Sequence, residues 1–268
     1  MAIIAIELPN VGKICYFCGR IHAMHLKEKV MEYAVLAAGQ GSRLLREGEK
    51  SSKPMISILG KPMIERLIRL LVDCGAERVH IVTNPAMDDL NTHLAYLRDT
   101  EGLPINFRPI ISDNSFYSLS EAARDIKGKF IAMTVDAIFP TAEFKEYVKA
   151  VESMPEGEAI MALTRYVDDE SPLYARLNDA GDEVIDYRYG GEPFPGEPIV
   201  SAGIYGISDE IMKIAQEEQY PASTSDFQRI LAVGDRVKVV PFEFSKAFDV
   251  DHVSDRIAAE EFLAEVNK

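Results

Sequence analysis

The sequence has no tryptophan, few cysteines and no long apolar segment among its 268 residues. Its three cysteines (Cys15, Cys18 and Cys74) cannot build a framework of disulfides. The longest apolar runs reach about half a dozen residues, whereas a membrane-spanning helix needs about 20. No secretory signal is evident at the start of the chain. These absences exclude a membrane protein and favour a cytoplasmic one.

Basic residues are also in deficit: 29 Lys and Arg stand against 43 Asp and Glu, a net charge of -14. A surface this acidic repels nucleic acid, which is normally bound by a basic stripe. Any phosphates handled by this chain therefore belong to a small ligand, screened by a few local cations and a divalent metal. The composition, with 47% hydrophobic and 27% charged residues, is that of a globular protein able to bury a core. It does not indicate an oligomeric state.

The first thirty residues differ in charge from the rest, with four basic residues against two acidic ones. Met24 and Met31 could each serve as a start site, so residues 1–30 are interpreted as an N-terminal extension that the mature protein could lack. A single domain is expected over residues 31–268. The spacing of Cys15, Cys18, His22 and His25 permits a zinc site. The gap between its two pairs is much shorter than in a usual zinc finger, which favours a weakly ordered segment.

From residue 33 onward, short apolar runs alternate with helical patterns. Strands are expected at Tyr33–Ala37, Arg78–Thr83, Ile105–Ile110 and Phe130–Val135, and helices at Lys61–Cys74, Ala86–Asp99, Tyr117–Ile126 and Thr141–Met154. This alternation predicts an α/β fold with a doubly wound, mainly parallel, Rossmann-like sheet. Ligands bind at the carboxyl ends of the strands in such a sheet.

The second half of the chain has a different order of expected strands and helices. Strands are expected at Glu158–Arg165, Leu173–Asn178, Glu183–Tyr189, Ile199–Ile207 and Val237–Phe242, and helices at Ser208–Gln216, Ser225–Val233 and Val253–Val266. The turn signal Asp179-Ala180-Gly181 joins the second and third of these strands. The pattern predicts a small antiparallel lobe added to the sheet.

The strongest chemical signal is the run from Leu36 to Leu44, Leu-Ala-Ala-Gly-Gln-Gly-Ser-Arg-Leu, followed by Lys53-Pro54-Met55. Glycines let backbone N–H groups approach phosphate oxygens closely. Arg43 can bind two phosphate oxygens at once, and Lys53 adds a point charge. A glycine pair alone would equally suit an ordinary strand-to-helix turn. The dinucleotide-binding fingerprint fits less well, because Leu44 stands where its third glycine would be.

Further segments follow the glycine loop in an order similar to that found in one protein family. Together with the glycine loop, these segments are similar to the signature of nucleotidyltransferases that activate sugar phosphates and related phosphorylated alcohols. They are the lysine-proline segment Lys53–Ile64, Val135–Phe139 at the place of a metal-binding aspartate, Ala202–Tyr205 as the sugar-side strand, and Asp249–Asp255 as the second acidic motif. The resemblance covers most of residues 33–266 and implies a sheet of the GT-A type.

The resemblance implies a role for each of these residues. Arg43 and the backbone of Gly39–Ser42 would hold the β- and γ-phosphates of a nucleoside triphosphate, and Lys53 would neutralise charge at the α-phosphate. Asp136, with Asp249 or Asp251, would coordinate Mg²⁺. The nucleotide-binding set is Leu36, Ala37, Ala38, Gly39, Gly41, Ser42 and Asn114. The acceptor-binding set is Arg188, Gly203 and Lys246.

The chemistry explains why such residues suffice. An oxygen of a small phosphorylated acceptor attacks the α-phosphorus of the nucleotide, and pyrophosphate leaves. Cations screen the repulsion between these anions and stabilise the leaving group. A protein nucleophile is not required, because the acceptor phosphate is already ionised near neutral pH. The absence of a Ser-His-Asp or Cys-His set from the sequence therefore agrees with this activity.

Two features leave the metal ligands and the activity open. Asp249 and Asp251 are expected to point to opposite faces of an extended segment, one as the ligand and the other as a cap of the last helix. Val135 stands where the family usually has glycine before the metal aspartate, which would suit a nucleotide sensor without activity. A metal-dependent glycosyltransferase that uses Asp249-Val250-Asp251 is a further alternative.

The acceptor and the base of the nucleotide are open as well. The usual Glu-Lys-Pro segment has no clear counterpart, and Arg188 or Lys246 could replace its lysine. Asp113–Leu119 resembles a stretch of phosphocholine cytidylyltransferases, so CTP and phosphocholine are the alternative substrates. The aromatic residues that could hold a choline group are Phe116, Tyr117, Tyr187 and Tyr189.

Overall fold

A computed structural model of the chain describes residues 5–8, 12–17, 20–23, 31–39, 41–218 and 220–266. The chain divides into two compact units, Met1–Val30 and Met31–Lys268. In the first unit, β1 (Ala5–Leu8), β2 (Gly12–Phe17) and β3 (Arg20–Ala23) form an antiparallel three-stranded sheet. The side chains of this unit lie outside the described part, so the zinc site at Cys15, Cys18, His22 and His25 stays a prediction.

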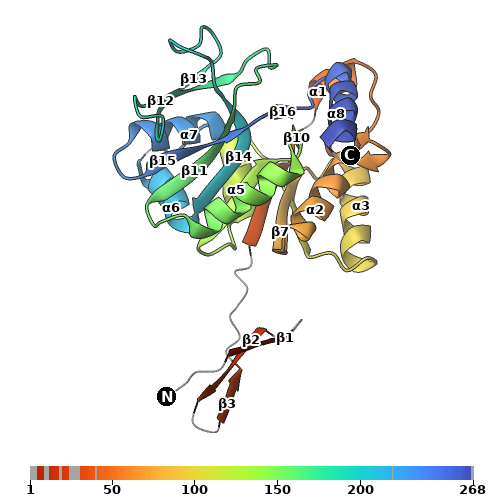
Figure 1. The fold of residues 1–268 in the computed structure, drawn as a ribbon. Helices are drawn as coiled ribbons and strands as arrows, with labels where there is room; N and C mark the ends of the chain where they lie inside the picture. The colour runs from red at the N-terminus through yellow and green to blue at the C-terminus, as the bar shows by residue number, and fades with distance from the viewer. Residues whose placement is uncertain are drawn as a thin grey trace. The chain divides into compact units, whose positions relative to one another are not determined.

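The second unit is built on a nine-stranded mixed sheet (Figure 1). Its central strands are parallel to one another: β9 (Lys129–Thr134), β4 (Met31–Ala37), β7 (Ala76–Thr83) and β8 (Ile105–Pro109), in that spatial order. All four end at the same edge of the sheet. The glycine loop after β4 and the aspartate after β9 therefore lie side by side.

The remaining strands extend the sheet beyond β9. They are β14 (Val200–Ser208), β11 (Glu158–Thr164), β15 (Lys238–Phe244), β12 (Leu173–Leu177) and β13 (Val184–Tyr189). Strand β14 is antiparallel to both β9 and β11, β15 is parallel to β11, and β12 and β13 form an antiparallel hairpin. The expectation of a mainly parallel sheet with an antiparallel lobe in the second half is confirmed.

Helices cover both faces of the sheet. Alternate residues of a strand point to opposite faces, so Tyr33 and Val35 of β4 lie in one core and Ala34 and Leu36 in the other. The first core is closed by α2 (Met63–Asp73), α3 (Asp88–Asp99) and α5 (Thr141–Ser153). The second core is closed by α4 (Ser115–Ala123), α6 (Asp209–Glu218) and α7 (Thr224–Val233). The fold is therefore doubly wound.

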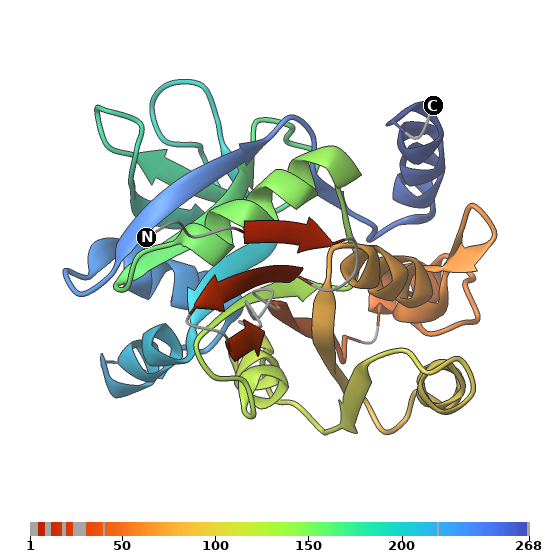
Figure 2. The ribbon, with the colours of Figure 1, turned by 60° about the horizontal axis from the view of Figure 1, so that its bottom comes forward.

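The last helix, α8 (Val253–Val266), packs against a segment some two hundred residues earlier in the chain. Figures 1 and 2 show α8 beside the segment from α1 to α2. The short elements of this region are α1 (Ser42–Arg46), the 3₁₀ turn η1 (Lys53–Met55), and the two-residue pairs β5 (Ser57–Ile58) with β6 (Lys61–Pro62) and β10 (Ala137–Ile138) with β16 (Phe248–Asp249). A small third core joins them through Leu44, Ile58 and Leu263. This core fixes the C-terminal acidic segment against the glycine loop.

The helices of the described ranges include none that is long and apolar enough to cross a membrane.

Candidate active site

The loop after β4 turns sharply at Gly41. Gly41 has φ 62° and ψ 42°, a left-handed conformation, at the start of α1. A Cβ atom at this position would lie 2.6 Å from Cβ of Lys53. Glycine is therefore required at position 41 for two reasons: the positive backbone angle φ, and the close approach of η1 to the loop. This packing sets the position of the Lys53 side chain relative to the loop.

The change Gly41→Ala should destabilise the protein by about 1–3 kcal/mol, because alanine is strained at this positive φ. The displaced Lys53 side chain should lower activity as well. Urea unfolding monitored by circular dichroism measures the stability. Gly39→Ala in the same loop is the matched control, since Gly39 has no positive φ and its Cβ would meet no atom within 4 Å. Equal effects of the two changes would contradict the role given to Gly41.

Lys53 is the buried cation of the site. Its turn is fixed by a hydrogen bond from the Ser52 N–H to the Asp89 carboxylate (2.9 Å). Only 10% of the Lys53 side chain is exposed, and Nζ forms ion pairs with Asp136 and, at 2.6 Å, with Oδ1 of Asp251. Burial lowers the pKa of Lys53, but the charges of the two aspartates outweigh burial and raise the pKa above its ordinary value. Lys53 is therefore protonated at neutral pH.

The two acidic segments meet through the short pair β10–β16. Ala137 lies opposite Asp249 in this pair, and the Val250 N–H donates to the carbonyl of Asp136 at 3.3 Å. Asp136 itself follows β9 directly, where the Val135 N–H donates to the Leu36 carbonyl at 3.1 Å. Residues more than a hundred positions apart are thereby brought to one point beside the glycine loop.

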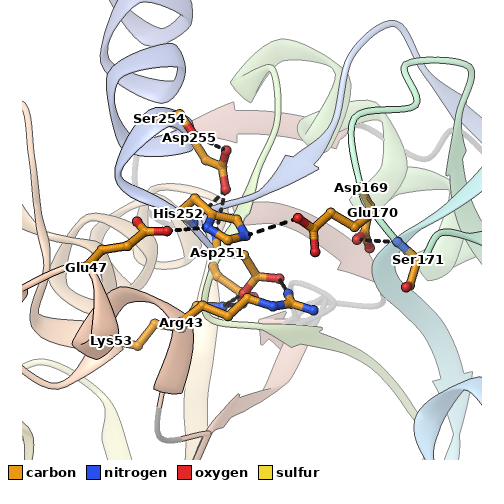
Figure 3. A network of polar contacts seen from close by, with 11 residues as sticks. Arg43, Glu47, Lys53, Asp169, Glu170, Ser171, Asp251, His252, Ser254 and Asp255 are labelled. Atoms are coloured by element: carbon orange, nitrogen blue, oxygen red, sulfur yellow. Dashed lines mark hydrogen bonds and ion pairs between the residues drawn. The ribbon is translucent and has the colours of Figure 1, made fainter.

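Asp251 connects the two predicted cations (Figure 3). Its Oδ2 accepts a hydrogen bond from Nη1 of Arg43 at 2.7 Å, while its Oδ1 faces Nζ of Lys53. Burial raises the pKa of Asp251, but Lys53 and Arg43 together lower it below its ordinary value. Asp251 is therefore ionised, and it does not cap α8.

Asp249 lies beside this cluster without an ion pair among the described residues. Asp249 is exposed toward a cavity that it lines. Desolvation by the cavity walls, together with the charge of Asp136, raises the pKa of Asp249 above its ordinary value. Asp249 and Asp251 line the same cavity, so the expectation that they point to opposite faces is wrong. Residues two apart in an extended segment share a face.

The segment after Asp251 is anchored to the first half of the chain by Glu47. One Glu47 oxygen accepts a hydrogen bond from the Val253 N–H at 2.8 Å, and the other lies 2.5 Å from Nδ1 of His252 (Figure 3). Asp255 accepts hydrogen bonds from the backbone N–H groups of Asp251 (2.9 Å) and His252 (2.7 Å). These contacts satisfy the N–H groups at the start of α8 and hold the Asp251 backbone in place.

Two cavities meet at the wall formed by Arg43 and Asp251. The larger, about 700 Å³, lies over the carboxyl ends of β4 and β9. Predicted site residues that line it are Leu36, Ala38, Gly39, Gly41, Ser42, Arg43, Lys53, Asn114, Asp136 and Asp251. Its volume suits a nucleotide-sized ligand.

The larger cavity also has lining residues that the sequence did not single out. Hydroxyl side chains contribute much of this surface, namely Ser112, Ser115, Ser118, Thr134 and Thr224. Ser115 and Thr224 connect the starts of α4 and α7, with the Thr224 N–H donating to Oγ of Ser115 at 2.9 Å. Asn114 caps α4, its side-chain oxygen accepting from the Tyr117 N–H at 2.8 Å.

The smaller cavity, about 80 Å³, lies on the other side of Arg43 and Asp251. Carboxylates dominate its lining: Asp168, Asp169, Glu170, Asp249, Asp251 and Asp255. The rings of Tyr166 and Phe248 also line it. The acidic run 168–170 was visible in the sequence, but it carried no motif that pointed to a site.

Several predicted residues lie outside the linings of both cavities. Arg188 packs on the ring of Phe194 (4.3 Å) and donates to the Glu192 carbonyl at 3.1 Å. Lys246 lies over the rings of Tyr166 (4.3 Å), Phe262 (5.1 Å) and Phe248 (5.2 Å). Ala37 is buried in the core, and a Cβ at Gly203 would lie 3.0 Å from Oγ1 of Thr134 and 3.9 Å from Oδ1 of Asp249.

The aromatic residues suggested for a choline group are divided between core and surface. Phe116 and Tyr187 are fully buried in the second core. Tyr117 and Tyr189 are exposed. Neither pair forms an aromatic enclosure at the smaller cavity, where the rings present are those of Tyr166 and Phe248.

The geometry agrees with the comparisons to known proteins. Residues 33–189 match the family model described as "MobA-like NTP transferase domain". The chain belongs to this family. It is therefore a nucleotidyltransferase, as its resemblance implied. The matched range contains the glycine loop, Lys53 and Asp136, whereas Asp249 and Asp251 lie beyond it.

Individual relatives of this nucleotidyltransferase are distant in sequence. The bifunctional protein GlmU of Maricaulis maris is 26% identical over 66% of this chain, and the match spans 38% of GlmU. The UTP–glucose-1-phosphate uridylyltransferase AglF of Haloferax volcanii is 26% identical over 88% of this chain and 97% of its own. The solved structure of the inositol-1-phosphate CTP transferase of T. maritima has a TM-score of 0.71 and 17% identity, covering 89% of this chain and 97% of that one. This last likeness shows the fold.

A divalent cation is a candidate ligand for the acidic residues of the site. The described part of the chain has no three His, Cys, Asp or Glu side chains already grouped as a metal site. Asp136 and Asp251 nevertheless converge on one point, Nζ of Lys53, and Oδ1 of Asp136 is buried without a hydrogen-bond partner among the described residues. Mg²⁺ is commonly held by one or two carboxylates plus the phosphates of a substrate. The donor set fits a cation of that kind.

Proposed function

We propose that this nucleotidyltransferase joins the nucleoside monophosphate unit of a nucleoside triphosphate to a small phosphorylated acceptor and releases pyrophosphate. The observation that carries the proposal is the meeting of two cations, Arg43 and Lys53, with two carboxylates, Asp136 and Asp251, at the wall between two cavities. The larger cavity takes the nucleotide and the smaller one receives the acceptor. The reacting atoms then meet between them.

The residues of the larger cavity divide the work on the triphosphate. The backbone N–H groups of the Gly39–Ser42 loop and the guanidinium of Arg43 bind the β- and γ-phosphates, which leave as pyrophosphate. Lys53 places its charge at the α-phosphate, where negative charge builds up during the attack. The acceptor phosphate is the nucleophile, so the protein supplies orientation and charge rather than a covalent intermediate.

Asp136 and Asp251 are the residues that would hold Mg²⁺, with Asp249 adjacent to them. The bound ion would supply charge neutralisation at the phosphates of the nucleotide. Asp251 is preferred to Asp249 as the second ligand because its carboxylate already shares a cation with Asp136. Asp249 lines the smaller cavity, which is proposed for the acceptor.

The acceptor proposed is a sugar 1-phosphate or a similar phosphorylated alcohol. The carboxylates of the smaller cavity accept hydrogen bonds from hydroxyl groups, and Arg43 at its wall attracts the acceptor phosphate. The names of the relatives, which act on glucose 1-phosphate or inositol 1-phosphate, support this class.

Phosphocholine with CTP is the second candidate. The smaller cavity combines the acidic residues Asp168, Asp169 and Glu170 with the rings of Tyr166 and Phe248. Carboxylates and aromatic faces both attract a quaternary ammonium group. A metal-dependent glycosyltransferase would leave Arg43 and Lys53 without a substrate phosphate to bind, and it is the weaker alternative.

Pyrophosphate release tests the proposal. The full chain is incubated with Mg²⁺, each of the four nucleoside triphosphates, and glucose 1-phosphate, inositol 1-phosphate or phosphocholine. Release that requires both a triphosphate and an acceptor is the expected result, and the productive pair identifies the base and the acceptor class. Binding of a triphosphate without turnover would support a sensor instead. Hydrolysis of a nucleotide sugar without any pyrophosphate reaction would support a glycosyltransferase.

A further inference from the structure

The ammonium group of Lys53 occupies the point at which the proposed metal ligands converge. Nζ contacts Asp136 and lies 2.6 Å from Oδ1 of Asp251. The oxygens in contact with Nζ are Oδ2 of Asp136 and Oδ1 of Asp251. The lysine side chain is enclosed, with 10% of its surface exposed. A cation of the chain itself therefore fills the space between the two carboxylates.

The two carboxylates depend on Lys53 to different degrees. Asp251 has a second cation, because its Oδ2 is bound by Arg43 at 2.7 Å. Asp136 has Lys53 as its one ion-pair partner among the described residues, and its Oδ1 has no hydrogen bond there. Without Lys53, the carboxylate of Asp136 would be left buried and unpaired, next to the further negative charges of the acidic segment. Such an arrangement is costly unless another cation takes the place of the ammonium group.

A triphosphate offers Lys53 an alternative partner. Lys53 also lines the larger cavity, together with Gly41 and Arg43 of the proposed phosphate loop. Its backbone lies in η1, and the N–H of the preceding Ser52 is bound by Asp89, so the flexible four-carbon stem is the part that can reorient. Phosphates in that cavity would draw Nζ away from Asp136 and Asp251. The two carboxylates would then be open to a divalent cation at the moment when the phosphates are present to complete its ligands.

We propose that Lys53 is an intramolecular placeholder for the metal ion, closing the metal position in the nucleotide-free protein. This inference rests on the proposed function, since it takes the triphosphate as the ligand that withdraws Lys53. The arrangement couples the two binding events. The triphosphate draws the positive charge of Lys53 away from the metal position, and the metal ion neutralises the carboxylates that would otherwise hold Lys53 there. The coupling is reciprocal. The factor by which a bound metal ion raises the affinity for the triphosphate should equal the factor by which a bound triphosphate raises the affinity for the metal ion.

Binding of Mn²⁺ to the nucleotide-free full chain tests the inference. Electron paramagnetic resonance of free Mn²⁺ measures the dissociation constant for the wild type and for Lys53→Met, which keeps the length of the side chain without its charge. We expect Lys53→Met to bind Mn²⁺ at least about tenfold more tightly, because one positive charge is removed from the ion's position. Lys61→Met is the charge-matched control: Lys61 is exposed on β6, and its loss should leave Mn²⁺ affinity unchanged.

Two further measurements make the outcome decisive. The double variant Lys53→Met/Asp136→Asn should lose the gained affinity, which locates the ion at Asp136. Lys53→Gln, which is neutral and polar, replaces Lys53→Met if that variant does not fold. Equal Mn²⁺ affinity of the wild type and the neutral variants would overturn the inference, as would a gain that survives Asp136→Asn. None of these measurements uses turnover, so a failure here is distinct from a failure of the pyrophosphate assay.

Discussion

Replacing Asp136 by asparagine should reduce kcat/KM for the pyrophosphate-releasing reaction roughly a thousandfold, or about 4 kcal/mol of transition-state stabilisation. The change keeps the size of the side chain and removes its charge. Asp136 directly follows β9 and lines the larger cavity, and its Oδ1 has no hydrogen-bond partner among the described residues. The lost carboxylate would weaken the hold on the metal ion and leave Lys53 with Asp251 alone. Steady-state kinetics over a range of Mg²⁺ concentrations measures the effect.

Asp125→Asn is the control for this prediction. Asp125 forms an exposed ion pair with Arg108 at 2.8 Å and lines neither cavity. Exposed pairs contribute little to stability, so its loss should leave kcat/KM within about twofold of the wild type. Thermal unfolding of both variants separates loss of activity from loss of fold. Turnover of a folded Asp136→Asn protein near the wild-type rate would remove Asp136 from the mechanism.

The fold could be predicted because its major elements carry strong local patterns. Met63, Ile64, Leu67, Ile68 and Leu71 recur at helical spacing, and all five are buried on the inner face of α2. The apolar run of β4 is buried on both faces, as expected for a central parallel strand. The expected boundaries differ from the observed ones by a few residues at most. Helix α4, for example, begins at Ser115 rather than Tyr117, because Asn114 caps it.

The short pairs that assemble the site could not be predicted in this way. Strands β10 and β16 have two residues each, too few for any periodicity, and they pair across more than a hundred residues of sequence. Their pairing decides the position of Asp249 and Asp251. The wrong expectation, that Asp249 and Asp251 point to opposite faces, concerned β16 and the two residues that follow it. The sequence placed both near the site, but contacts with Arg43 and Lys53 distinguish them.

The residues of the cavity walls differ in how strongly the sequence marks them. Gly41, Arg43 and Lys53 belong to a spaced motif, and this motif led to the larger cavity. The serine and threonine hydroxyls of that cavity are too common in loops and helix starts to be singled out. Tyr166 and His252 also line the smaller cavity. They lie in the segments that follow β11 and β16, and the course of these segments is set by tertiary structure. Acceptor recognition is therefore the part of the site that depends most on tertiary structure.

Replacing Lys53 by alanine should lower kcat/KM by about a hundredfold or more, because the charge at the α-phosphate is lost in an enclosed site. The same change leaves Asp136 unpaired, so the metal-free variant should unfold at a lower temperature than the wild type. Mn²⁺ should restore much of that loss by taking the place of the ammonium group. Pyrophosphate release and thermal unfolding, each with and without the metal, measure these effects.

Lys53→Arg should not rescue the activity of Lys53→Ala. Arginine keeps the charge, but its larger planar group has little space where Gly41 packs against the Lys53 stem and where 10% of the side chain is exposed. Lys61→Ala, an exposed change outside both cavities, should behave as the wild type. If arginine restored turnover fully, positive charge alone would be sufficient at this position. The close packing of Gly41 against Lys53 would then serve the stability of the loop rather than the placement of the charge.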